Sequence, residues 1–340
     1  MAVDANGADH GPAEVAAGAA LAAAEGVRVL LFGPAAEVGE LPDGVELVDS
    51  PISIAKAPDP ARAVRSTPDA SIVRAAAAVA EGRADALVSG GATGATLAAA
   101  LFNVRRAPGV SRPALALPVP IPGAPVLLLD VGANAEARPD QLLQFAFMGT
   151  AFAHGVLGVE RPRVALLSNG EEPTRGTPDV VAAHEQLAAA PGIAFIGNVE
   201  GTGLTAGVAD VVVTDGFTGN VALKLMEGVS ATLLGAIREV ADSSALAKAG
   251  GALLRPALRA LRDEIDPERV GGSYLLGLRR LVIVCHGRFT RRGFARAIEV
   301  AARAVRHDVA GRTHDRLAAA NALRSLAVEP SGAGATVPDP

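Results

Sequence analysis

Several stretches of the sequence place anion-binding side chains and glycines directly after short apolar runs. The stretch with the most such residues is Asp215-Gly-Phe-Thr218-Gly219-Asn220, and Lys224 follows one helical turn later. Donors at a helix start, with a lysine one turn on, suit a phosphate or an oxyanion. Packing alone explains this combination poorly. It therefore predicts catalytic roles for Asp215, Asn220 and Lys224, with Thr218 and Gly219 as substrate-binding residues.

A glycine-rich turn follows the apolar run that ends at Val88. Its sequence is Ser-Gly90-Gly91-Ala-Thr93, and it leads directly into an Ala- and Leu-rich helical stretch. Backbone amides that glycine leaves accessible at the positive end of a helix suit phosphate. The alternative is a turn kept small for close packing. We predict that Gly90, Gly91 and Thr93 bind phosphate.

Acids, amides and an arginine follow three further apolar runs. An arginine guanidinium can pair with phosphate, and a strand-end acid or amide can orient a ligand. The alternatives are a capped turn at Asp130 and Asn134 and a solvated loop around Arg175. The adjacent Glu171 and Glu172 leave the assistance of a divalent ion open, although we predict no metal site. The substrate-binding residues predicted in these loops are Asp130, Asn134, Asn169, Glu171, Arg175, Asn198 and Glu200.

The last apolar run ends at Cys285 and is followed by His286. An imidazole at this position is a candidate for proton transfer, and we include it among the catalytic residues. A structural histidine is the alternative. Cys285 itself is predicted to be a small core residue and not a nucleophile.

The apolar runs alternate with turns and Ala-rich helical stretches, and several are apolar at every position. This pattern predicts βαβ units, a mostly parallel sheet and a doubly wound three-layer α/β fold. In such folds ligands bind beyond the carboxyl ends of the strands, which is where the loops above belong. The predicted strands are Val27 to Phe32, Ala86 to Val88, Val126 to Asp130, Val164 to Ser168, Ala194 to Gly197, Val211 to Thr214 and Leu281 to Cys285.

One segment, residues 229–266, lacks strand signals and predicts a projecting helical hairpin that turns at Gly250-Gly251. Its second arm is amphipathic: Leu254, Leu258, Leu261 and Ile265 share one face, and Arg255, Arg259 and Arg262 flank it. The alternatives are a dimer or core-packing helix, a membrane-surface contact and a contact with an acidic protein. We expect one domain over residues 1–330 and a disordered tail over residues 331–340.

Composition narrows the class of protein. The 340 residues carry a net charge of −5 without long runs of like charge, so nucleic acid is not an expected partner. Aromatic residues make up only 3%, which predicts a core of Ala, Val and Leu. A single cysteine and the lack of an opening signal segment predict the cytoplasm. No run of eighteen uninterrupted apolar residues occurs, so we expect no transmembrane helix.

The motifs match one family in order and spacing, from Met1 to about residue 310. The chain resembles the phosphate:acyl-carrier-protein acyltransferases of the PlsX type, most specifically over residues 208–224. The resemblance implies formation of acyl phosphate from fatty acyl carrier protein and inorganic phosphate, without a dedicated cofactor. It also implies a homodimer, a fold related to isocitrate and isopropylmalate dehydrogenases, and a hairpin linked to peripheral membrane association. The product would pass to a glycerol-phosphate acyltransferase in phospholipid synthesis.

The chain departs from the family pattern in several loops. Ala92 replaces an asparagine, Asn6 and Ala8 alter the opening motif, and Arg288-Phe289 follows His286-Gly287 where a small polar pair is usual. Gly176-Thr-Pro likewise replaces Gly-Asn-Glu. These departures keep a second hypothesis open, a non-catalytic acyl- or phosphate-binding paralogue. A nicotinamide-dependent dehydrogenase is disfavoured because no Gly-x-Gly-x-x-Gly turn with a downstream acid is evident.

A direct attack of phosphate on a thioester needs an anion site and an oxyanion site in one pocket. We expect the turn at Gly90 and Arg175 to hold phosphate, and Asn220 with the backbone of residues 218–220 to stabilise the carbonyl oxygen. Lys224 would supply positive charge, while Asp215 or His286 would handle the proton. An acidic carrier protein also needs a basic surface. The candidates are Arg255, Arg259 and Arg262, or Arg279, Arg280, Arg288, Arg291 and Arg292.

Overall fold

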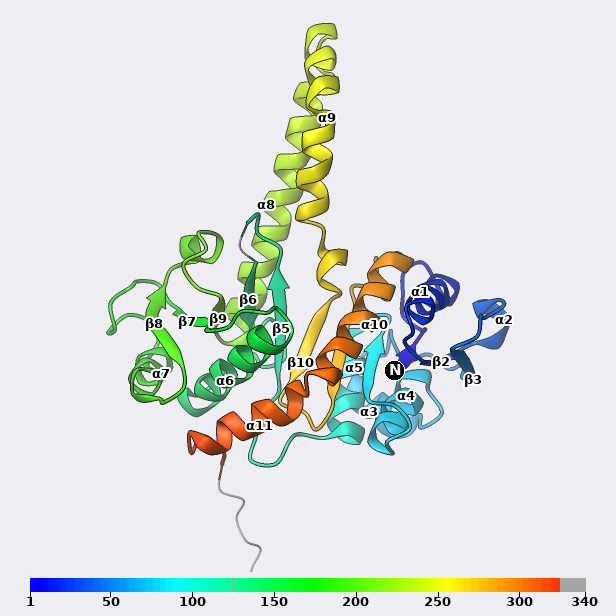
Figure 1. Cartoon of the computed structure of the whole chain (residues 1–340), viewed down its shortest axis with the longest axis horizontal. Helices are drawn as coiled ribbons and strands as arrows, with labels where there is room; N and C mark the ends of the chain where they lie inside the picture. Colours follow the sequence, from blue (N-terminus) through cyan, green and yellow to red (C-terminus); the bar gives the residue numbers. More distant parts are fainter. Residues whose placement is uncertain (124, 325–340) are drawn as a thin grey trace, which may run out of the picture.

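The structure, a computed structural model, describes residues 1–123 and 125–324. These residues form one eleven-stranded sheet with the order β3-β2-β1-β4-β11-β10-β5-β6-β9-β7-β8 (Figure 1). Most strands are buried on both faces, which accounts for their continuously apolar sequences. The strands are β1 (Ala2–Asp4), β2 (Val29–Gly33), β3 (Val45–Asp49), β4 (Ala86–Ser89), β5 (Ala114–Val119), β6 (Val126–Leu129), β7 (Arg163–Leu167), β8 (Ala194–Val199), β9 (Val211–Val213), β10 (Ser273–Leu276) and β11 (Leu281–Val284).

Helices cover both faces of the sheet, so the predicted three-layer α/β fold is confirmed. One face packs against α1, α6, α7, α10 and α11, and the other against α4, α5 and the first turns of α8. Apart from the α8–α9 hairpin, the helical elements are α1 (Pro12–Ala24), α2 (Ala35–Val38), α3 (Pro60–Ser66), α4 (Ser71–Ala80), α5 (Thr93–Ala99), η1 (Ala100–Val104), α6 (Pro139–Gly155), α7 (Pro178–Ala189), η2 (Gly201–Thr205), η3 (Pro267–Val270), α10 (Arg291–Arg306) and α11 (Val309–Ala319).

The sheet contains two parallel halves that run in opposite directions. Strands β1, β2, β3, β4 and β11 pair in parallel, and so do β6, β9, β7 and β8. Between them, β10 is antiparallel to both β11 and β5, and β5 is antiparallel to β6. The sequence did not reveal β3, β5 or β10. The predicted loops therefore follow two oppositely directed sets of strands, and not one set as we expected.

The predicted hairpin is present and projects from the body of the molecule (Figure 1). It consists of α8 (Gly216–Asp242) and α9 (Ala245–Glu264), so its first arm begins well before residue 229. The prediction that the hairpin turns at Gly250-Gly251 was wrong, because both glycines lie inside α9. The chain reverses instead at Ser243-Ser244, where the Ser244 side chain accepts a hydrogen bond from the Ala247 amide at 3.1 Å.

Helix α8 is the described segment that comes nearest to a membrane-spanning helix. By length and composition alone it is long and apolar enough to cross a membrane, with a mean hydropathy of 1.2, and none of that apolar window is buried. Glycine, serine, threonine, Lys224 and Glu227 interrupt its apolar residues, so it contains no long uninterrupted apolar run. Its first turns nevertheless pack into the body of the protein, where Gly216, Gly219 and Leu223 are buried.

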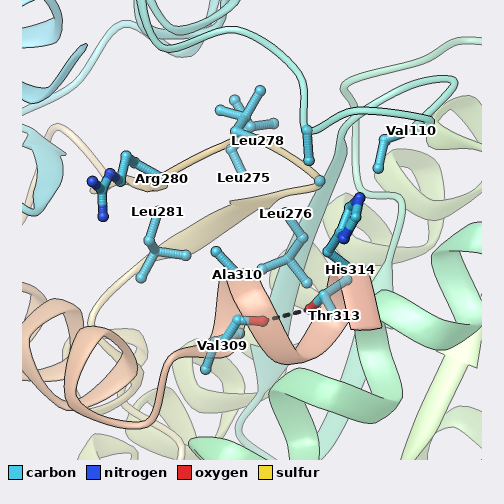
Figure 2. A pocket seen from close by; sticks show the side chains of 12 residues that line it. Val110, Leu275, Leu276, Leu278, Arg280, Leu281, Val309, Ala310, Thr313 and His314 are labelled. Carbon is cyan, nitrogen blue, oxygen red and sulfur yellow. Dashed lines mark hydrogen bonds between the residues drawn. The ribbon is translucent and has the colours of Figure 1, made fainter. Parts of the chain in front are cut away.

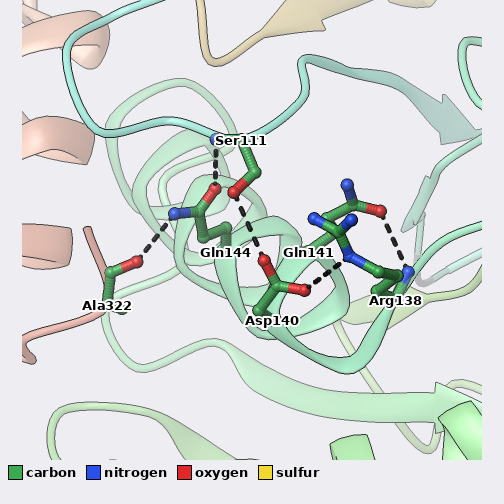
Figure 3. A network of polar contacts seen from close by, with 6 residues as sticks. All are labelled: Ser111, Arg138, Asp140, Gln141, Gln144 and Ala322. Carbon is green, nitrogen blue, oxygen red and sulfur yellow. Dashed lines mark hydrogen bonds and ion pairs between the residues drawn. The ribbon is translucent and has the colours of Figure 1, made fainter. Parts of the chain in front are cut away.

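A buried amide on α6 fixes the loop that leads into β5 (Figure 3). The Gln144 side chain accepts a hydrogen bond from the Ser111 amide at 2.8 Å. It donates to the carbonyl oxygens of Gly109 at 3.0 Å and Ala322 at 2.7 Å. One side chain therefore satisfies three backbone groups and joins α6, the loop before β5 and the segment after α11.

We predict that Gln144→Ala lowers the free energy of unfolding by about 2–4 kcal/mol, because it leaves buried backbone groups without partners. Chemical denaturation measures the change. Gln186→Ala, at an exposed position of α7, is the control and should shift stability by less than about 0.5 kcal/mol. Equal effects of the two substitutions would contradict this role of Gln144.

Candidate active site

A buried carboxylate organises the loop after β6. Asp130 accepts hydrogen bonds of 2.8–3.1 Å from the amides of Leu115, Gly132, Ala133 and Asn134 and from the Asn134 side chain. Burial raises the pKa of Asp130, and these donors oppose that shift. A carboxyl group surrounded by donors has no acceptor for a proton of its own, so it serves here as an ionised anchor. The capped turn that we considered as an alternative is therefore present.

The start of α8 is locked onto this loop. The Gly216 amide donates to the Asn134 carbonyl oxygen at 2.7 Å, and the Asp130 amide donates to that of Thr214 at 3.0 Å. Only glycine fits at position 219, because an added Cβ would lie 2.0 Å from the Asp130 carbonyl oxygen. A Cβ built on Gly132 would lie 3.8 Å from the side-chain nitrogen Nδ2 of Asn220. The Asn220 side chain is thus held beside the exposed Gly132.

The amides of Gly216, Thr218 and Gly219 at the start of α8 are already occupied, which corrects one of our expectations. Asp215 caps the helix: its carboxylate accepts from the Thr218 amide and the Thr218 hydroxyl, both at 2.8 Å. The Gly219 amide donates to the Asp215 carbonyl oxygen at 3.0 Å. Because capping consumes these donors, the backbone of residues 218–220 cannot serve as the oxyanion site in this arrangement. Both carboxylate oxygens of Asp215 are engaged in the cap as well.

Two polar side chains on the early turns of α8 remain accessible. Asn220 is exposed and makes no side-chain hydrogen bond within the part of the chain that the structure describes. Lys224, also exposed, forms an ion pair with Glu227 at 2.8 Å. The sequence did not indicate this partner, which a ligand anion would have to replace. Asn220 is therefore the most available donor of the predicted set.

The loop after β7 carries the predicted arginine. Asn169, Glu171 and Arg175 are exposed, and the Arg175 guanidinium contacts only the Glu172 carboxylate, at 3.3 Å, among the described residues. The pKa of Glu172 is lowered, first by its own backbone amide and then by Arg175. Strands β6, β9, β7 and β8 are consecutive and parallel, so this loop and the exposed Glu200 share an edge of the sheet with Asp130 and Asp215.

The glycine-rich turn belongs to the other half of the sheet, after β4. The Gly90 amide donates to the Asp4 carbonyl oxygen at 2.9 Å, and a Cβ on Gly91 would lie 2.6 Å from the Gly7 carbonyl oxygen. The next residue, Ala92, adopts a left-handed conformation with φ 58° and precedes α5 without a side-chain cap. The first amides of α5, beginning at Thr93, are thus left without the cap that occupies those of α8.

His286 follows β11 and lies at the same edge of the sheet as this turn, at the carboxyl ends of the strands, because β11 pairs in parallel with β4. The Asp9 amide donates to the Gly287 carbonyl oxygen at 2.8 Å, which ties the His286 loop to the loop after β1. The His286 Nδ1 accepts from the Arg288 amide at 3.3 Å. A neutral ring with this contact carries its proton on Nε2, so it presents a donor to solvent.

The predicted residues thus form two assemblies. The first contains Asp130, Asn134, Asn169, Glu171, Arg175, Asn198, Glu200, Asp215, Thr218, Gly219, Asn220 and Lys224, and the second contains Gly90, Gly91, Thr93 and His286. Within the described residues, no hydrogen bond joins one assembly to the other. That both line a single pocket remains a prediction.

Sequence reasoning missed Asp4, a fully buried acid at the end of β1. Burial raises its pKa to about 7. Its carboxyl group accepts from the Asn6 amide at 3.3 Å and the Ser89 hydroxyl at 3.4 Å. It lines a small cavity together with Asn6, Ser71, Gly91 and Thr96. Its position at a strand end, immediately before a glycine-containing loop, was the available signal.

Cys285 is buried, and burial raises the pKa of its thiol, which agrees with a core residue. Among the described residues, no three His, Cys, Asp or Glu side chains gather as a metal site. A mostly apolar crevice between β10, β11 and α11 is lined by Leu275, Val309 and His314, among others, and includes none of the predicted site residues (Figure 2).

Residues 1–312 match the family model described as "Fatty acid synthesis protein". The phosphate acyltransferase of Heliobacterium modesticaldum is 43% identical over 91% of this chain and 94% of that protein. The phosphate acyltransferase of Lactococcus lactis subsp. lactis is 40% identical over 92% of this chain and 96% of that protein. The chain belongs to the phosphate acyltransferase family. This confirms the predicted family and enzyme class, and nothing in these matches favours the non-catalytic alternative.

Solved structures with little sequence identity share the fold of this phosphate acyltransferase family member. A phosphotransacetylase from Streptococcus pyogenes matches with a TM-score of 0.61 at 19% identity, covering 90% of this chain and 94% of that one. The 4-hydroxythreonine-4-phosphate dehydrogenase of Klebsiella pneumoniae matches with a TM-score of 0.53 at 15% identity, covering 89% and 98%. The predicted relation to a dehydrogenase-type fold is confirmed at the level of architecture.

The raised pKa of Asp4 predicts a specific pH dependence of stability. Because the folded value is near 7 and the ordinary value is 3.8, the native state binds more protons between these values. The free energy of unfolding should therefore fall as pH rises from about 4 to 7 and level off above. We expect Asp4→Asn to reduce the fall between pH 5 and pH 8 by about 2–3 kcal/mol.

Urea denaturation at several pH values measures this difference. Asp43→Asn, at an exposed position, is the matched control and should retain the pH dependence of the unmodified protein. If Asp4→Asn also retains it, the carboxyl group of Asp4 does not bind the proton.

Proposed function

We propose that this protein transfers a fatty acyl group from the thioester of an acyl carrier protein to inorganic phosphate. The products are acyl phosphate, for phospholipid synthesis, and the free carrier thiol. Family membership supports the acyl transfer to phosphate. The observation that carries the site assignment is the fused assembly of the Asp130 loop and the α8 start, which holds Asn220 in an exposed position beside Gly132.

The proposed reaction needs no enzyme nucleophile. An oxygen of hydrogen phosphate attacks the thioester carbonyl carbon and forms a tetrahedral oxyanion. Collapse of this intermediate breaks the carbon–sulfur bond and releases the carrier thiolate, and the proton of hydrogen phosphate ends on that sulfur. The protein must therefore position a dianion, stabilise the oxyanion and assist one proton transfer.

We assign the oxyanion to the Asn220 amide and to Lys224, which becomes available when it leaves Glu227. Arg175 and the uncapped start of α5 at Thr93 hold phosphate, whose negative charge suits a guanidinium and a helix amino terminus. A hydrogen bond from the exposed Nε2–H of His286 stabilises the charge on the leaving sulfur until that sulfur takes the proton of hydrogen phosphate. Asp215 takes a structural role as the cap of α8, and Asp130 and Asn134 support the loop.

The direct test measures the release of free thiol from acyl carrier protein with and without inorganic phosphate. We expect release that requires both phosphate and the protein. Release that is independent of phosphate would indicate a thioesterase, and no release would indicate a binding protein. Either result contradicts the proposed function.

Asn220→Ala should lower kcat by about ten-fold to a thousand-fold, because it removes a donor to the developing oxyanion. The matched control is Asn103→Ala, whose side chain only hydrogen-bonds to the Ala99 carbonyl oxygen one helical turn earlier. An unchanged rate in a folded Asn220→Ala protein would remove Asn220 from the mechanism.

We further propose that the hairpin forms a homodimer through α8. Val221, Leu225, Val229 and Leu233 recur at four-residue intervals and are 48–66% exposed. An exposed row of large aliphatic side chains is typical of an interface. A second copy offers the same row, so a two-fold pairing of α8 helices would bury both. The more exposed Leu246 and Leu253 on α9, with Arg255, Arg259 and Arg262 on the same helix, suit peripheral contact with an anionic membrane.

The basic residues proposed for the carrier protein fall in three places. Arg255, Arg259 and Arg262 lie on α9, Arg279 and Arg280 precede β11, and Arg288, Arg291 and Arg292 follow it. Arg291 is already paired with Glu14 at 2.8 Å. The group after β11 is next to His286, so we place the acidic carrier there.

Leu233→Glu should convert a dimer to a monomer, because it places a charge in the apolar row at a position that is 58% exposed. Light scattering coupled to size exclusion measures the mass. Ala231→Glu is the control, since a step of two residues turns about 200° around a helix and places the charge away from the row. A monomeric unmodified protein, or equal effects of both substitutions, would contradict the proposed dimer.

A further inference from the structure

The buried side chain of Asn198 connects the loop that carries Arg175 to helix α7. Asn198 lies in β8 and is only 6% exposed. Its Nδ2 donates to the Glu172 carbonyl oxygen at 2.9 Å. The same carbonyl accepts the Arg175 amide at 3.0 Å. One oxygen atom therefore joins the sheet to the turn that presents the arginine.

The opposite end of this amide contacts a histidine that the sequence did not single out. His184, on α7, has its Nδ1 at 3.0 Å from the Asn198 Oδ1. Because a carbonyl oxygen only accepts, Glu172 requires the nitrogen of the Asn198 amide to face it. The oxygen then faces His184, so the proton of this ring must be on Nδ1.

The imidazole is held in this orientation by packing. The Phe195 ring lies edge-on to it, with ring centroids 5.0 Å apart and an angle of 77°. A hydrogen bond from a fixed ring selects one of the two orientations of the Asn198 amide. Without it, the amide loses one of its two contacts, and only the hydrogen bond to the Glu172 carbonyl keeps its donor in place.

We propose that His184 is a positioning residue for phosphate binding, acting through the Asn198 amide and the Glu172 carbonyl on the turn that carries Arg175. The Arg175 side chain is 61% exposed, and its only ion-pair partner in the described chain is Glu172. The placement of its guanidinium therefore depends on the backbone of this turn. The proposal rests on the role given to Arg175 in the proposed function.

Two substitutions separate the hydrogen bond from the packing of the ring. His184→Phe keeps an aromatic ring against Phe195 but removes the donor. His184→Asn loses the ring but places a donor nitrogen near the position of Nδ1. Steady-state kinetics with the full-length protein then give KM for phosphate, KM for acyl carrier protein and kcat for each variant.

For His184→Phe we expect KM for inorganic phosphate to rise about ten-fold, the effect of about 1.4 kcal/mol in binding. The KM for acyl carrier protein and kcat at saturating phosphate should stay within about two-fold of the unmodified protein. His184→Asn should restore most of the affinity for phosphate. His307→Phe, at an exposed histidine after α10, is the control and should change none of these constants.

A double-mutant cycle tests the route through the arginine. In an Arg175→Ala background, His184→Phe should add no further increase in KM for phosphate, because the group that it positions is gone. Additive effects would overturn the proposal. So would an unchanged KM for phosphate in His184→Phe, equal increases of both KM values, or failure of His184→Asn to restore affinity.

If His184→Phe does not fold, Asn198→Asp tests the same connection. An aspartate can still accept from His184 but cannot donate to the Glu172 carbonyl, so it should produce the same selective increase in KM for phosphate. An unchanged value would overturn the proposal. Failure of the proposed function is distinguishable, because the unmodified protein would then show no phosphate-dependent release of thiol.

Discussion

The candidate site depends above all on the burial of one ionised carboxylate. Asp130 takes hydrogen bonds from β5, from its own loop and from the Asn134 side chain, and its backbone joins the segment that enters α8. Burying a charge without partners costs several kcal/mol, so this loop has few alternative conformations that keep the carboxylate satisfied. The exposed donors near it are consequently placed by the interior of the protein. Rigid support of this kind is what stabilisation of an oxyanion requires.

Much of the fold followed from simple patterns in the sequence. Continuous apolar runs such as those that became β4, β6 and β9 are typical of strands buried on both faces, and each was located within one or two residues. The sequence pattern did not reveal β5 or β10. Pro118 interrupts β5, and β10 contains Tyr274 and is flanked by glycines, so neither gave a periodic apolar signal. These strands reverse the direction of the sheet. Pairing between residues far apart in the chain leaves no local trace, so the two halves could not be distinguished in advance.

The candidate site was likewise predicted only in part. Residue types at strand ends led us to predict Asn220, Arg175 and the Gly90 turn as site residues, because glycine and donor side chains at helix starts suit anion binding. Which donors remain available was not predictable. Asp215 consumes the first amides of α8, and Glu227 engages Lys224, whereas Ala92 leaves the start of α5 uncapped. The proposed role of His184 could not be predicted for a related reason. It depends on a hydrogen bond between α7 and Asn198 in β8, which the sequence does not show.

Helix α8 links two regions of the molecule that would otherwise be separate. Its second turn carries Asn220, and the same uninterrupted helix, about 40 Å long at the usual rise per residue, continues to the end of the projecting hairpin. A helix of this kind resists bending, so it acts as a lever. A partner that binds the distal end of α8 and tilts the helix would also displace the side-chain amide of Asn220 near its other end. A force on the distal end of the hairpin is therefore transmitted along one continuous helix toward the turn that carries Asn220.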